Sequence, residues 1–234
     1  RFAVVHGPVP PAPARVPPEF CTHDRIIAAL SRISYTFPMS QSQHPYRTIL
    51  FTGRPGSGKE TQARRLAEET GYHLFSTGER FRELREHRDS LGARVKEVYD
   101  TGKLLPSWFA EYLFEDALLK IPHGTGIIFE GTGRWREEAE LFDQVTAWLN
   151  RAYKVINLEV SEEEALRRQM SRAQAGNRPD SNSEEKIKIR FEEYKAHTAA
   201  AIAFFREKGA VIDIDGEQSP DKITADIRAA LGLS

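Results

Sequence analysis

The chain has 234 residues, with 33 basic and 34 acidic side chains and a net charge of −1 at pH 7. This length accommodates one well-buried α/β domain with extensions, and the balanced charge argues against a dedicated nucleic-acid-binding protein. Cys21 is the only cysteine, which excludes a disulfide framework and a cysteine-based zinc site. No apolar run approaches the ~18 residues of a membrane span, and no secretory signal is evident. We therefore expect a cytoplasmic, monomeric enzyme without zinc that binds neither nucleic acid nor membranes.

Residues 1–45 differ in composition from the rest of the chain. Six prolines fall within the first twenty positions, which is typical of extended linkers. We interpret this stretch as a disordered N-terminal extension. Either residues 1–38 precede a biological start at Met39 and are translated in error, or they form a genuine tail or targeting segment.

From residue 46 to residue 234, apolar runs and amphipathic segments alternate, which predicts one α/β domain with a parallel sheet covered on both faces. The predicted strands are 47–52, 73–76, 126–130, 153–160 and 210–214. The predicted helices are 59–70, 78–86, 90–101, 107–120, 136–150, 162–172, 184–208 and 220–231. We expect Trp148 to lie in the core.

The stretch 53–62 reads Gly-Arg-Pro-Gly-Ser-Gly-Lys-Glu-Thr-Gln and follows the first strand directly. Glycines let the backbone curl so that its N–H groups face a phosphate, and a lysine adds a positive charge. A strand, a Gly-x4-Gly-Lys turn and a helix in this order predict a phosphate-binding loop. Serine or threonine usually follows the lysine of such a loop; here Glu60 follows Lys59, and Thr61 comes one position later.

Further motifs follow in order along the chain. They are Ser76-Thr77-Gly78-Glu79-Arg80-Phe81-Arg82, Gly102-Lys103-Leu104-Leu105-Pro106, Glu130-Gly131-Thr132-Gly133-Arg134, and Arg172, Arg178-Pro179-Asp180-Ser181-Asn182 and Arg190. With the loop, they resemble the motifs of nucleoside monophosphate kinases, adenylate kinases above all, over residues 46–232. Because the motifs match in sequence order, the resemblance is far more specific than the loop alone.

The resemblance implies a P-loop NTPase fold, a three-layer sandwich with a five-stranded parallel sheet. It also implies a helical monophosphate-binding segment at about 77–105 and a short lid at about 173–184. The expected reaction transfers the γ-phosphoryl group of ATP, bound with Mg²⁺, to AMP and yields two ADP. Such a reaction needs positioning and cationic groups more than covalent chemistry, and arginine suits it because its planar fork binds phosphate oxygens in pairs.

The resemblance assigns four groups of residues by position. The catalytic set is Lys59, Arg134, Arg178 and Arg190. The ATP-binding set is Gly53, Pro55, Gly56, Ser57, Gly58, Lys59, Glu60, Thr61, Arg168 and Arg172. The monophosphate-binding set is Thr77, Gly78, Arg82, Leu104, Leu105, Gly131, Arg134 and Glu138. Contacts to Mg²⁺ through water fall to Glu130, Thr61 and Asp180.

Departures from the family pattern leave the acceptor and the turnover open. Glu60 puts a carboxylate beside the phosphate loop, and Glu130 replaces the family's aspartate. Glu138 stands where adenylate kinases usually carry glutamine; a carboxylate only accepts hydrogen bonds, which suits the donors of guanine better than adenine. Alternatively, Glu138 is an exposed helix residue. The alternatives for the whole protein are a kinase for another monophosphate such as GMP, or a regulatory nucleotide-binding protein with little turnover.

Overall fold

The computed structural model describes residues 46–174 and 179–233. The predictions for the extension at 1–45 and for Arg178 lie outside the described residues.

A parallel sheet forms the centre of the domain. Its strands are β1 (Thr48–Gly53), β2 (His73–Ser76), β3 (Ile127–Glu130), β4 (Tyr153–Glu159) and β5 (Val211–Asp215). They are arranged in the order β2-β3-β1-β4-β5, and every neighbouring pair is parallel. The predicted five-stranded parallel sheet is confirmed, with each strand end within one residue of its predicted position.

The helices follow the predicted pattern with one difference. They are α2 (Lys59–Thr70), α3 (Thr77–Arg85), α4 (Ser90–Tyr99), α5 (Ser107–Lys120), α6 (Arg136–Trp148), α7 (Glu162–Gln174), α8 (Glu184–Glu193), α9 (Ala199–Glu207) and α10 (Pro220–Leu231). The helix predicted over 184–208 is interrupted by a π-helical turn, η3 (Tyr194–Thr198), between α8 and α9. The wider turn changes the direction in which its side chains point, and such turns occur frequently at functional sites.

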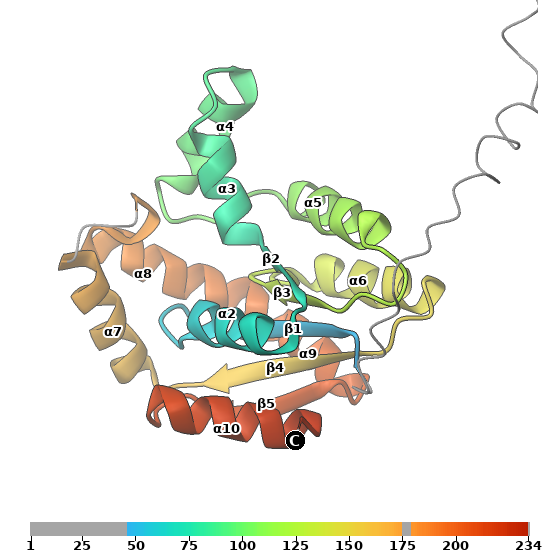
Figure 1. Cartoon of the computed structure of the whole chain (residues 1–234). Coiled ribbons are helices and arrows are strands. Elements are labelled where there is room, and N and C mark those ends of the chain that lie inside the picture. The colour runs from blue at the N-terminus through green and yellow to red at the C-terminus, as the bar shows by residue number, and fades with distance from the viewer. Residues whose placement is uncertain (1–45, 175–178, 234) are drawn as a thin grey trace, which may run out of the picture. The chain divides into compact units, whose positions relative to one another are not determined.

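Helices cover both faces of the sheet, so the fold has three layers (Figure 1). Successive strand residues point to opposite faces, and Ile49 and Phe51 pack with α2 and α10. Leu50 lies on the other face with Phe129 and Phe142, in the core formed with α5, α6 and α9. Burial on both faces explains the apolar runs of the central strands β1 and β3, which are buried along their whole length. Among the helices of the described residues, none is long and apolar enough to cross a bilayer.

The central strand β1 has β3 on one side and β4 on the other. Since the connections leave in opposite directions there, the loops at the carboxyl ends of these strands leave a crevice between them. Above this edge, α3 and α4 project from the body of the domain (Figure 1). One prediction for the core is wrong: Trp148 ends α6 with 78% of its surface exposed, because it points away from the helix face that buries Ala139, Phe142 and Thr146.

Candidate functional site

The phosphate-binding loop predicted from the sequence connects the buried strand β1 to α2. Gly53, Gly56 and Gly58 all adopt positive φ angles, of 132°, 91° and 95°. A Cβ atom at Gly53 would lie 2.6 Å from the Leu158 carbonyl oxygen, and one at Gly56 would lie 2.7 Å from that of Ala165. The loop therefore requires glycine at these two positions for space as well as for backbone conformation.

Lys59 is folded back over this loop. Its Nζ donates hydrogen bonds to the carbonyl oxygens of Gly53 at 2.9 Å and Arg54 at 2.8 Å. Burial lowers the pKa of Lys59 from 10.5 to about 7; Glu130 acts in the opposite direction, while Arg134 and other nearby arginines lower the pKa further. The ammonium group of Lys59 is therefore poorly hydrated and lies among other cations. Because of this environment, it would interact strongly with an anion.

One cavity brings together most of the predicted site residues from distant parts of the chain. Those that line it are Gly53, Pro55, Gly56, Gly58, Lys59, Glu60, Gly78, Arg82, Leu104, Leu105, Glu130, Gly131, Arg134, Arg172, Asp180 and Arg190. Within the described residues, the lining does not include Ser57, Thr61, Thr77, Glu138 or Arg168.

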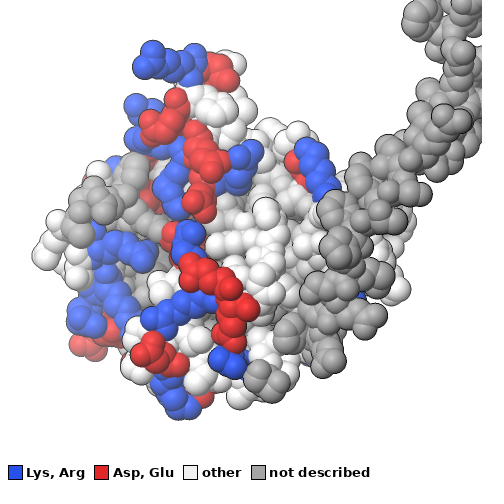
Figure 2. Space-filling model, viewed as in Figure 1, with Lys and Arg blue, Asp and Glu red and all other residues white. Residues whose placement is uncertain are grey.

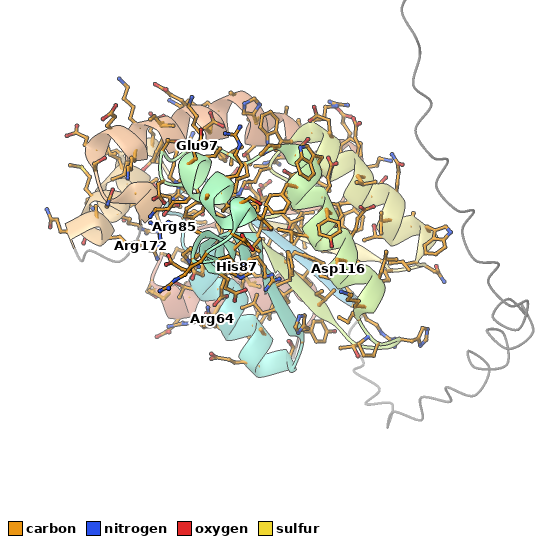
Figure 3. The ribbon with its side chains drawn as sticks, turned by 90° about the horizontal axis from the view of Figure 1, so that it is seen from above. Arg64, Arg85, His87, Glu97, Asp116 and Arg172 are labelled. Atoms are coloured by element: carbon orange, nitrogen blue, oxygen red, sulfur yellow. The ribbon has the colours of Figure 1, made fainter. Side chains whose placement is uncertain are left out.

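Arginines reach the cavity from four elements. Arg82 comes from α3, Arg134 from the β3–α6 connection, Arg172 from α7 and Arg190 from α8. Seen from above in Figure 3, Arg172 lies on the same side as Arg64 and Arg85, opposite Asp116 of α5. Four separated cations around one cavity provide charge for a ligand with several phosphate groups.

The cavity arginines differ in their partners. Arg190 forms an ion pair with Asp180, and both side chains are largely buried. The Arg134 guanidinium passes close to Gly131, where a Cβ atom would lie 2.9 Å from Arg134 Nη2. Arg168, assigned to ATP binding by resemblance, instead pairs with Glu164 at 2.6 Å and donates to the Gly216 carbonyl oxygen at 2.8 Å. In this structure Arg168 therefore connects α7 to the loop after β5.

Acidic groups in the cavity fit a magnesium ion held through water. Mg²⁺ typically binds through one or two carboxylates, several waters and the phosphates of the substrate. Glu130 ends β3 inside the cavity, and its Oε2 accepts a hydrogen bond of 2.8 Å from Ser76 Oγ. This bond orients the carboxylate. Thr61 is exposed on α2 and lies outside the lining, so within the described residues Glu130 has the better position of the two.

The segment predicted to bind a monophosphate begins at α3. Ser76, rather than Thr77, caps this helix, since Ser76 Oγ accepts a hydrogen bond of 3.3 Å from the Glu79 N–H. Thr77 is buried, and its hydroxyl is 2.8 Å from that of Thr132. Thr132, which replaces an aromatic residue of the family pattern, thereby ties the end of β3 to the start of α3.

Glu138 is only 2% exposed, so the alternative of an exposed helix residue is wrong. Its Oε2 accepts a hydrogen bond of 2.9 Å from the backbone N–H of Arg134. Burial raises the pKa of Glu138 to about 7, although the backbone bonds and the Arg134 charge oppose this. The carboxylate therefore shapes the loop that carries Arg134, and its role in base recognition stays a prediction.

We expect Glu138→Gln to change how stability depends on pH. With a pKa of about 7 in the fold against 4.5 normally, Glu138 takes up a proton on folding between these values. The free energy of unfolding contributed by this group is greatest below pH 4.5 and falls as pH rises through 7. The glutamine variant does not lose this stabilisation. The difference in melting temperature, variant minus wild type, should therefore increase from pH 5 to pH 8. Glu137→Gln, at an exposed neighbour, is the control; parallel curves for all three proteins would contradict the assignment.

Several lining residues were not predicted from the sequence. They are Phe51, Thr52, Phe81, Tyr99, Gly102, Lys103, Thr132, Gln169, Glu193, Tyr194 and Thr198. Tyr99 receives a hydrogen bond of 3.5 Å from Arg82, and Glu193 accepts one of 3.2 Å from the Leu104 N–H. Tyr194 and Thr198 begin and end the π-helical turn. Four of them, Phe81, Gly102, Lys103 and Thr132, lie within the quoted motifs, and that position was the sequence signal that could have identified them.

A glycine-rich loop between β1 and α2, a parallel sheet in this strand order, and a cavity ringed by arginines define a P-loop phosphotransferase. The family model described as adenylate kinase matches residues 51–210. The chain belongs to the adenylate kinase family, a family of phosphotransferases that act on nucleotides.

Individual relatives agree with this family. An adenylate kinase of Thermus thermophilus is 35% identical over 188 residues, which cover 80% of this chain and 98% of the relative. One of Maricaulis maris is 38% identical over 186 residues, covering 78% and 97%. One of Archaeoglobus fulgidus is 30% identical over 210 residues, covering 78% and 97%. The similarity thus extends over nearly the whole length of each relative.

Proposed function

We propose that the protein transfers the γ-phosphoryl group of ATP, bound with Mg²⁺, to AMP and releases two ADP. The observation that carries the proposal is the single cavity in which the loop lysine Lys59 meets Arg82, Arg134 and Arg190. A donor and an acceptor that both carry phosphate repel each other, and cations shared between them offset that repulsion.

In this proposal the loop of residues 53–58 holds the β- and γ-phosphates with its backbone N–H groups, and Lys59 exchanges its carbonyl partners for phosphate oxygens. Arg82 and Arg134 grip the acceptor's α-phosphate. Arg190, with Arg172, stabilises the charge on the phosphoryl group as it moves between the two oxygens. Since apolar and polar walls surround these groups, closure over bound nucleotides would exclude water from the transfer path.

Mg²⁺ would be held by phosphate oxygens and by waters oriented by Glu130, and it would neutralise charge on the donor's phosphates. The segment at 77–105 and the lid at 173–184 are the parts that we propose to move on binding. The cytoplasmic location, the monomeric state and the independence of zinc stay predictions from the sequence.

The proposal predicts that ATP binding takes up a proton above pH 7. Burial holds the pKa of Lys59 at about 7 in the empty site, and adjacent phosphates would raise it. At pH 8 most empty sites therefore carry a neutral Lys59 that becomes charged on binding, so the apparent affinity for ATP falls as pH rises above 7. Calorimetry in buffers of different ionisation enthalpy should detect uptake of about one proton at pH 8. Lys59→Met should abolish the uptake, whereas equal heats in all buffers for the wild type would contradict it.

A coupled assay of ADP formation with ATP, Mg²⁺ and each of AMP, GMP, CMP and UMP tests the acceptor. We expect the highest kcat/KM with AMP. Preference for GMP would favour the alternative acceptor that a carboxylate at Glu138 suggests. ATP binding without turnover on any acceptor would favour the regulatory alternative.

A further inference from the structure

Glu60 and Arg82 form an ion pair within the lining of the cavity. Glu60 is in the first turn of α2, directly after Lys59, and Arg82 belongs to α3. Glu60 Oε1 lies 3.7 Å from Arg82 Nη2, and each side chain is 25% exposed. Both residues line the cavity. A carboxylate of the phosphate-loop helix thus pairs with an arginine of the segment that projects above the sheet.

Arg64 extends this contact into a short network. Its Nη2 lies 4.0 Å from Glu60 Oε1 and 3.8 Å from Glu79 Oε2, so it bridges α2 and α3. In Figure 2, side chains of both charges form a mixed band that runs downward from the projecting α3 and α4 over α2. Lys59, although adjacent to Glu60 in sequence, turns inward to the carbonyl oxygens of Gly53 and Arg54. The Glu60 carboxylate is consequently directed to the arginine side of the cavity.

The contact of the Glu60 carboxylate with Arg82 is chemically similar to the contact that a nucleotide phosphate would make with the same arginine. Arginine binds carboxylate and phosphate through the same planar set of N–H donors. In this structure the guanidinium of Arg82 has the Tyr99 hydroxyl at 3.5 Å and the Glu60 carboxylate at 3.7 Å. A monophosphate gripped by Arg82 would bring a second anion to a guanidinium that already has one, and the two anions would repel.

We propose that Glu60 competes internally with the acceptor's phosphate: its carboxylate holds Arg82 while the acceptor site is empty and releases it when a nucleoside monophosphate binds. This inference rests on the proposed function, in which Arg82 grips the acceptor. The competition lowers the affinity for the acceptor and keeps Arg82 positioned near the phosphate loop between turnovers.

The test compares binding of AMP and of adenosine by calorimetry for the full chain and its variants. Glu60→Gln keeps the size of the side chain and removes its charge. We expect it to tighten AMP binding about two- to fivefold, the range for a partly exposed ion pair. Adenosine has no phosphate for Arg82 to bind, so its affinity should not change. Glu60→Gly, which removes the whole side chain, should shift AMP binding in the same direction.

Glu83→Gln is the matched control, because it removes one negative charge from the helix that carries Arg82 while Glu83 pairs with Arg80. Thermal melting checks that each variant folds. AMP affinity that is unchanged or weaker in both Glu60 variants overturns the proposal. An equal gain for adenosine, or an equal gain in Glu83→Gln, also overturns it, since shape or net charge would then explain the effect.

Failure of this inference differs from failure of the proposed function. If the wild type phosphorylates AMP and the Glu60 variants bind it no better, only the inference is wrong. If the wild type prefers GMP, the same comparison made with GMP and guanosine tests whether Glu60 competes with the acceptor's phosphate. A wild-type chain that binds no nucleoside monophosphate overturns both.

Discussion

Lys59→Met should lower kcat on the order of 10³-fold with the fold intact, because removing one preorganised cation from a developing phosphoryl charge has an effect of this size. Lys59 is partly buried beside the loop, and its Nζ donates hydrogen bonds to two carbonyl oxygens. Methionine is similar in length and uncharged, so the variant tests the charge rather than the volume. The measurement is steady-state kcat in the coupled assay, with thermal melting to confirm that the variant is folded.

Lys120→Met serves as the control for this variant. Lys120 is the last residue of α5, has 74% of its side chain exposed and pairs with Asp116, four residues earlier. It is outside the cavity lining among the described residues, so its kcat should match the wild type. A folded Lys59→Met enzyme with kcat within a few-fold of the wild type would remove the central role given to this lysine.

Arg134→Ala should lower kcat/KM for the acceptor on the order of 10²–10³-fold. Arg134 follows β3 and enters the cavity over Gly131, while Glu138 fixes its backbone N–H. Arg134→Lys keeps the charge but loses the planar fork, so it should recover only part of the loss. The assay varies AMP at saturating ATP, which separates the acceptor's contribution from that of the donor.

Arg136→Ala is the matched control for Arg134, two residues away. Arg136 begins α6 with half of its side chain exposed and pairs with Glu140 at 2.8 Å. Its loss should leave kcat/KM for AMP nearly unchanged. Equal effects at the two positions would mean that the general positive charge of this region matters, and that Arg134 makes no specific contact with the acceptor.

The sheet could be predicted because its strands are short apolar runs bounded by polar turns, and this pattern is local. The phosphate loop could be predicted for the same reason, since its glycines and Lys59 are adjacent in sequence. The π-helical turn at Tyr194–Thr198 could not, because the buried residues on either side of it keep a spacing that also fits a regular helix. The exposure of Trp148 could have been predicted, because helical spacing places it away from the face formed by Ala139, Phe142 and Thr146.

In the site, the contacts between elements that are distant along the chain could not be predicted from the sequence. Tyr99 is 17 residues from Arg82, and Glu193 is 89 residues from Leu104, so neither pairing has a sequence signal. Glu60 was noticed as a departure from the motif, but its contact with Arg82 depends on how α3 is oriented toward α2. Arg168 illustrates the converse: the resemblance assigned it to ATP binding, yet in this structure it pairs with Glu164 and does not line the cavity.

Label transfer from ATP tests phosphoryl transfer to AMP most directly. The full chain is incubated with Mg²⁺, unlabelled AMP and ATP carrying ³²P in its γ-phosphate, and the nucleotides are separated at early times. We expect the label to appear in the β-phosphate of ADP formed from AMP, and we expect Lys59→Met to reduce the rate of its appearance on the order of 10³-fold. Label that stays in ATP, or appears only as inorganic phosphate, would contradict the account.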